Sequence, residues 1–109
     1  MTSTPAWIAL IAAGLLEVVW AIATKYADGY SRPNWSLVSL LLLAGSVYLL
    51  SRALQALPVG TAYAVWTGIG AIGTVLMGVA LFGETLNPLR AGGIALVLAG
   101  LIALRLAPA

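Results

Sequence analysis

Four long apolar stretches follow one another along the chain, separated by short polar segments. They cover roughly residues 7–24, 35–51, 59–82 and 89–107, and each is close to the ~20 residues with which a helix crosses a bilayer. The stretches lack the alternation of a membrane β-barrel, and an open sheet edge is not tolerated in lipid. The pattern therefore predicts an all-α membrane protein with four transmembrane helices in a single domain, residues 1–109.

The polar segments carry the residues expected at helix ends. Asp28-Gly29 follows the first apolar stretch, and glycine readily adopts the left-handed conformation that ends a helix. Pro58 is expected in the first turn of the third helix. Asn87 and Pro88 predict an N-cap and a first-turn proline for the fourth helix.

Composition narrows the class of protein further. Hydrophobic residues make up 62% of the chain and charged residues 7%, whereas a soluble domain is about a quarter charged. The chain has no Cys and no His, which removes disulfides and the commonest metal ligands, and its five cations are too scattered to bind nucleic acid. We expect no metal, no cofactor, no nucleic-acid partner and no cleavable signal peptide, because the first stretch lacks a basic flank and contains a glutamate.

The distribution of charge says little about which way the chain inserts. One side of the membrane would carry Arg52 and Arg105, and the other Lys25, Arg32 and Arg90. Since positive residues mark the cytoplasmic side, two against three is a weak signal. Identical chains could insert both ways round and form an antiparallel, dual-topology homodimer.

Glycines mark two places where helices are expected to meet or bend. Gly93 and Gly100 are seven residues, or two turns, apart, so they lie on one face of the fourth helix and predict a dimer contact. The run from Gly68 to Gly73 matches the dinucleotide motif G-x-G-x-x-G letter for letter. It lies inside an apolar helix rather than after a strand, so we interpret Gly68 and Gly70 as a hinge in the third helix.

Glu17 is the strongest functional signal in the chain. It lies near the middle of the first apolar stretch, where a charged carboxylate costs at least about 2.5–3.5 kcal/mol. Burial favours the neutral form of a carboxyl group, which puts proton exchange within reach without any histidine. A role limited to hydrogen bonding between helices is the alternative interpretation.

Several other residues are candidates for the same site. Small residues within one helical turn of Glu17 could open a cavity beside it: Ala13, Gly14 and Ala21. Trp20 also lies one turn away and could cover that cavity, while Ser46, Tyr63 and Trp66 lie within the second and third stretches. If these side chains converge, they combine carboxylates, aromatic rings and hydrogen-bond donors, and such a site suits an organic cation or a proton.

The chain resembles the small multidrug resistance family of proton-coupled exporters along essentially its whole length. The segments that carry the resemblance to its guanidinium exporter subgroup are 17–21 (Glu-Val-Val-Trp-Ala), 25–29 (Lys-Tyr-Ala-Asp-Gly) and 58–70. Exporters of polyaromatic cations in this family typically have a glycine where this chain has Trp20. The resemblance therefore favours guanidinium.

The resemblance implies an antiparallel homodimer in the bacterial inner membrane, with both Glu17 carboxylates at one central site. Trp20, Ser46, Tyr63 and Trp66 would line this site, and Ser46 and Trp66 would help to hold Glu17. The chain would then be a proton-coupled antiporter of guanidinium-type cations. A promiscuous quaternary-ammonium exporter, an uncoupled channel and a non-transporting membrane assembly subunit are the alternatives, and an enzyme is not expected because no nucleophile and base are paired.

Overall fold

The computed structural model describes residues 3–108, and within them the chain forms four α-helices. Helix α1 spans Ser3–Tyr26, α2 spans Pro33–Ala53, α3 spans Val59–Phe82 and α4 spans Pro88–Leu106. All four are long and apolar enough to cross a membrane. The expected all-α architecture of four membrane-spanning helices is confirmed.

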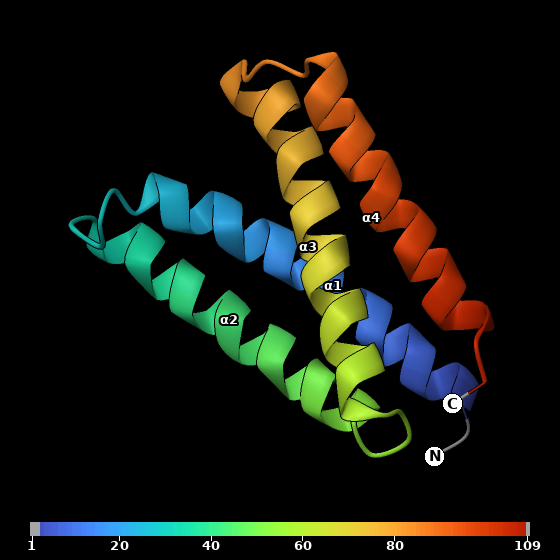
Figure 1. Cartoon of the computed structure of the whole chain (residues 1–109). Helices are drawn as coiled ribbons and strands as arrows, with labels where there is room; N and C mark the ends of the chain where they lie inside the picture. The colour runs from blue at the N-terminus through green and yellow to red at the C-terminus, as the bar shows by residue number, and fades with distance from the viewer. Residues whose placement is uncertain (1–2, 109) are drawn as a thin grey trace.

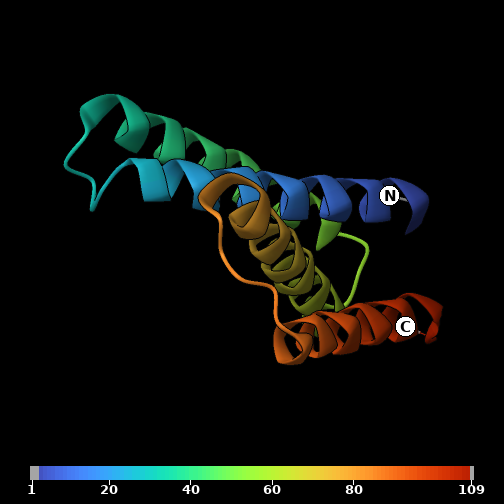
Figure 2. The same ribbon diagram turned by 90° about the horizontal axis from the view of Figure 1, so that it is seen from above.

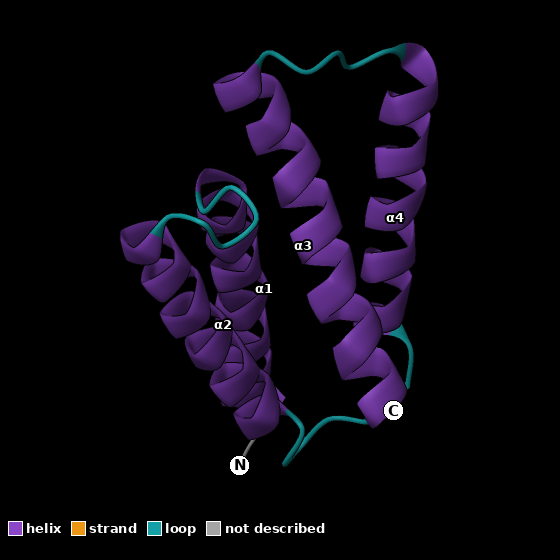
Figure 3. Cartoon of the chain, turned by 90° about the vertical axis from the view of Figure 1, so that its left-hand side faces the viewer, coloured by secondary structure: helices purple, strands orange, loops and turns teal. Residues whose placement is uncertain are grey.

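The helices form an α1–α2 hairpin to which α3 and α4 are added in sequence. α1 and α2 run side by side and share the most extensive interface (Figure 1). α3 packs across α1 and only touches α2, and the α4 backbone approaches that of α3 alone. α4 therefore lies at the edge of the bundle and reaches α1 of the hairpin through side chains alone (Figures 2 and 3).

A polar seam joins α1 to α2 within the membrane. Ser39 and Ser46 are two turns apart on α2, and both are fully buried. The Ser46 hydroxyl donates to the backbone oxygen of Ala13 at 2.7 Å. The Ser39 hydroxyl lies 2.7 Å from that of Thr24 and 2.9 Å from that of Tyr30. Since each serine has a partner, the seam fixes the register of the hairpin without leaving a buried hydroxyl unsatisfied.

The loop after α1 turns through three consecutive left-handed residues. Asp28, Gly29 and Tyr30 have φ angles of 51°, 69° and 64°. Asp and Gly visit this region at low cost, whereas Tyr does so rarely, and the hydrogen bond with Ser39 anchors the Tyr30 side chain. That bond also holds the pKa of Tyr30, outside the membrane spans, below its ordinary value.

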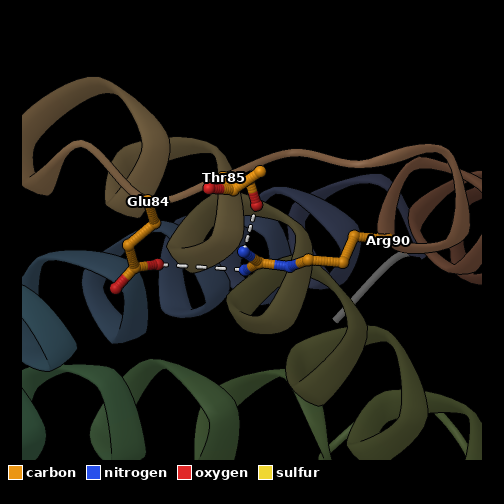
Figure 4. A network of polar contacts seen from close by, with 3 residues as sticks. All are labelled: Glu84, Thr85 and Arg90. Atoms are coloured by element: carbon orange, nitrogen blue, oxygen red, sulfur yellow. Dashed lines mark hydrogen bonds and ion pairs between the residues drawn. The ribbon is translucent and has the colours of Figure 1, made fainter.

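The loop between α3 and α4 is organised around Arg90 (Figure 4). Gly83, with φ of 66°, ends α3 in the left-handed conformation. The Asn87 side chain accepts a hydrogen bond from the Arg90 backbone N–H at 2.8 Å, so Asn87 is the N-cap of α4 as expected. The Arg90 guanidinium donates to the Thr85 carbonyl and lies 3.8 Å from the Glu84 carboxylate.

The apolar core lies at the end of the bundle where α1 begins and α2 ends. Its fully or nearly fully buried residues are Leu10, Ala53, Ala62 and Val65. Pro58 immediately precedes α3, so its expected place in the first turn is wrong by one position; its carbonyl accepts from the Ala62 N–H at 3.0 Å. The proline nitrogen has no hydrogen to satisfy there.

Candidate functional site around Glu17

The Glu17 carboxylate lies against the backbone of Gly70 on α3. A Cβ added to Gly70 would be 3.0 Å from Glu17 Oε2 and would overlap with Oε1. Only glycine leaves room for the carboxylate at this depth, because any other residue would place at least a methyl group in the same space. Gly70 therefore determines how closely α3 approaches the acidic side chain of α1.

Two buried polar atoms near this contact have no partner within residues 3–108. They are Glu17 Oε2 and the indole nitrogen Nε1 of Trp20, one helical turn further along α1. An unsatisfied buried polar group costs about 1–3 kcal/mol, and more when it is charged. Glu17 Oε2 can accept a hydrogen bond and Trp20 Nε1 can donate one, and Trp20 also contributes to the lowered pKa of Tyr30, whose hydroxyl lies near its indole nitrogen.

Ser46 and Trp66 are linked to α1, although not through Glu17. The Trp66 indole N–H donates to Ser46 Oγ at 2.9 Å, and Ser46 donates in turn to the carbonyl of Ala13. The single hydroxyl hydrogen of Ser46 is thus used on the α1 backbone, one turn before Glu17. In this structure the two side chains hold the helix that carries Glu17 rather than the carboxylate itself.

Tyr63 lies beside Trp66 but faces outwards from the chain. The two ring centroids are 5.7 Å apart, with an angle of 53° between the ring planes. Tyr63 is 58% exposed, whereas Trp66 is partly buried against the apolar core. The structure therefore brings Trp66 into the bundle and leaves the Tyr63 ring on an open face of the single chain.

The small residues near Glu17 differ in what they contact. Ala13 is fully buried below Ser46, and a Cβ on Gly14 would lie 2.7 Å from the Ile69 side chain of α3. These two residues permit close helix packing and do not open a cavity. Ala21 lines a cavity of about 70 Å³ at the far end of α1, which Lys25 also lines.

The other glycines occupy two distinct environments. A Cβ on Gly68 would lie 2.7 Å from the Leu101 side chain of α4, so Gly68 permits the α3–α4 contact. α3 is helical through both Gly68 and Gly70, and their role as a hinge stays a prediction. Gly93 and Gly100 are exposed and a Cβ on either would meet nothing within 4 Å. Their role as a dimer contact also stays a prediction.

The hydroxyl groups of Thr24, Ser39 and Tyr30 were not anticipated from the sequence. Thr24 lies seven residues, or two turns, after Glu17 and donates to the Trp20 carbonyl at 2.7 Å. Ser39 lies seven residues before Ser46. A spacing of seven residues places Glu17 and Thr24 on one face of α1, and Ser39 and Ser46 on one face of α2. This repeated spacing is the feature of the sequence from which the polar contacts could have been predicted.

The four helices and the partly buried Glu17 carboxylate define a multi-pass membrane protein with an ionisable group inside its span. The family model described as Small Multidrug Resistance protein matches residues 5–97, and the chain belongs to this family. The described residues contain no group of three acidic side chains suited to a metal ion. Membership of this transporter family and the four spans establish a multi-pass protein of the bacterial inner membrane.

Similar proteins match the chain over nearly its whole length. The guanidinium exporter of Yersinia pseudotuberculosis is 54% identical over 102 residues, which cover 94% of this chain and 98% of the relative. The guanidinium exporter of Escherichia coli (strain K12) is 51% identical over 100 residues, covering 92% and 95%. That of Citrobacter freundii is 50% identical with the same coverage.

Proposed function

We propose that the protein is a proton-coupled antiporter that exports guanidinium-type cations, and that it works as an antiparallel homodimer with one shared site. The name of its relatives, guanidinium exporter, supports the substrate. The observation that carries the chemistry is the partly buried Glu17 carboxylate, whose buried Oε2 has no hydrogen-bond partner among residues 3–108. A transporter of this kind needs no nucleophile and no cofactor.

Guanidinium suits the polar atoms around Glu17. It is planar and carries only donors, so its edges can bond carboxylate oxygens while its face stacks on an aromatic ring. Trp20 lies one turn from Glu17, and its buried N–H has no hydrogen-bond acceptor among residues 3–108. In the proposed dimer this N–H is available to a carboxylate, including the Glu17 carboxylate of the second copy.

The open surfaces of the single chain support a dimer. Tyr63 is proposed to line the site, yet it is 58% exposed. None of the residues of α4 is buried, and Gly93 and Gly100 lie open on that helix. A second, inverted copy packed on these faces would enclose the aromatic rings and bring two Glu17 side chains together.

The coupling of cation export to proton movement then follows because cations and protons compete for the same two Glu17 carboxylates. A proton or a cation neutralises the site, whereas two bare carboxylates within lipid are costly. If the empty, charged site rarely reorients, a cation leaves only in exchange for protons. In an antiparallel dimer of identical chains, the inward-open and outward-open states have the same structure, with the conformations of the two subunits exchanged. Each subunit would bend α3 at Gly68 and Gly70 in one state and straighten it in the other.

Exchange in proteoliposomes tests this proposal. A guanidinium gradient should drive proton movement through the wild-type protein, detected by a pH-sensitive dye inside the vesicles. Glu17→Gln should abolish the exchange, and Glu84→Gln should retain it because Glu84 lies in the loop beside Arg90. Retained exchange in Glu17→Gln would refute the proposed site, and absence of exchange in the wild-type protein would favour a role as a non-transporting assembly subunit.

A further inference from the structure

Arg105 and Trp7 lie together where two cavities meet. The Arg105 guanidinium carbon is 5.0 Å from the centre of the Trp7 ring, so the cation lies over the ring. Both residues line both cavities. The pair is found at the end of the bundle where α1 begins and α4 ends (Figure 1).

The first cavity is an apolar groove that runs from this pair into the membrane span. It has a volume of about 280 Å³. Ile11 of α1, Ile69 of α3 and Ile102 of α4 are among the side chains that line it. A groove of this composition between three membrane helices suits a hydrocarbon chain.

The second cavity lies towards the membrane surface. It has a volume of about 210 Å³ and is lined by the connection between α2 and α3, including Pro58, by Thr61, and by Ala107 and Pro108 after α4. Trp side chains favour the headgroup level of a bilayer, and Trp7 lies between the two cavities. The arrangement therefore places a compartment of mixed character, with the Thr61 hydroxyl in its wall, outside an apolar one, and the Arg105 guanidinium lies at the boundary.

The charged side chains at this end of the bundle are all positive. The three acidic residues of the chain are Glu17, within the span, and Asp28 and Glu84, in the loops at the opposite end. Arg52 and Arg105 lie at the same end as the two cavities. The Glu84 carboxylate is paired with Arg90, and among residues 3–108 no acidic side chain forms an ion pair with Arg105, so its charge is available to an anion.

We propose that the two cavities form a binding site for one anionic phospholipid. The phosphate bonds Arg105 and the headgroup occupies the outer cavity, while an acyl chain lies in the groove between α1, α3 and α4. Basic pockets between membrane helices bind anionic headgroups in this way. The excess of positive charge at this end favours an anionic lipid over a zwitterionic one.

This site is separate from the proposed dimer contact. At about 100° per residue, Arg105 lies about 140° and Ile102 about 160° around α4 from Gly100. A second copy packed on Gly93 and Gly100 would leave this face of α4 to lipid. Lipid binding is therefore expected whether or not the protein exchanges guanidinium for protons.

Native mass spectrometry of the purified full chain tests the site. Phosphatidylglycerol should bind the wild type more tightly than phosphatidylcholine does. Arg105→Gln should weaken phosphatidylglycerol binding by about tenfold or more, because it removes a charge-assisted hydrogen bond. Arg52→Gln removes the same charge at the same end but away from the cavities, and should weaken binding by less than about threefold.

A second pair of variants tests the groove independently of charge. Ile102→Trp should fill the apolar cavity and reduce lipid binding, while Leu98→Trp, at an equally exposed position of α4 that lines neither cavity, should not. Equal loss in Arg105→Gln and Arg52→Gln, or equal binding of both lipids, would overturn the proposal. So would a drop in dimer content in Ile102→Trp with lipid binding unchanged, since the groove would then be covered by a second copy.

Discussion

The Glu17 carboxylate of α1 lies against the backbone of Gly70 in α3. The carboxylate occupies the space that a side chain on residue 70 would need, since a Cβ there would overlap with Glu17 Oε1. The glycine therefore has a positional role independent of any bending of the helix. The position of the carboxylate and the packing of α3 are coupled at this point.

Gly70→Ala should impair transport by displacing the Glu17 carboxylate. A displacement of about 1 Å at a reacting group can lower activity on the order of 100-fold, and we expect guanidinium exchange to fall by about 10- to 100-fold. Gly60→Ala is the matched control, because a Cβ at Gly60 in the first turn of α3 meets nothing within 4 Å. Exchange at wild-type rates in Gly70→Ala proteoliposomes would contradict the proposed importance of this contact.

Trp20→Gly should shift selectivity from guanidinium towards a quaternary ammonium ion. Loss of the ring removes a stacking face worth about 0.5–2 kcal/mol to a cation, or roughly 2- to 30-fold in binding, and opens space for alkyl groups. Transport currents for guanidinium and tetrapropylammonium measure the change. Trp35→Ala serves as a control, because Trp35 stacks on Tyr26 at the far end of the hairpin, and parallel losses for both cations would argue against Trp20 as the selecting residue.

Ser39→Ala should destabilise the α1–α2 hairpin. The substitution removes the buried hydroxyl that links Thr24 to Tyr30, and such bonds between membrane helices contribute about 0.6 kcal/mol on average and up to about 1.7. Ser36→Ala is a suitable comparison, because the Ser36 hydroxyl bonds only the Arg32 carbonyl of its own helix turn. Unfolding in a detergent titration should separate the two variants; identical stabilities would mean that the seam does not fix the hairpin.

The four helices could be predicted because lipid leaves the backbone few alternatives. In a bilayer the backbone N–H and C=O groups must form hydrogen bonds within the segment, so the length of each apolar stretch was sufficient to predict a membrane-spanning helix. Asn87 as an N-cap followed from a local preference of the same kind. Glu17 was identifiable because a carboxylate in the middle of such a stretch is costly.

The rotation of each helix about its axis could not be predicted in the same way. When all faces of a helix are apolar, hydropathy does not say which face meets a neighbour. Ser46 was therefore expected beside Glu17, whereas it bonds Ala13 and Trp66. Gly70 was interpreted from its sequence motif as a hinge, and only the packing of α3 on α1 shows that it also makes room for the carboxylate.

Proton release on substrate binding tests the central claim, that guanidinium and protons share Glu17. Guanidinium should be added to the purified protein in weakly buffered detergent while the pH is recorded. We expect binding to release protons from the wild type and to weaken as pH falls, by up to about tenfold per pH unit for each proton displaced, because protonation removes the negative charge that attracts the cation. The Glu17→Gln variant should neither bind guanidinium nor release protons. Guanidinium binding without proton release in the wild type, or unchanged proton release in Glu17→Gln, would contradict the account.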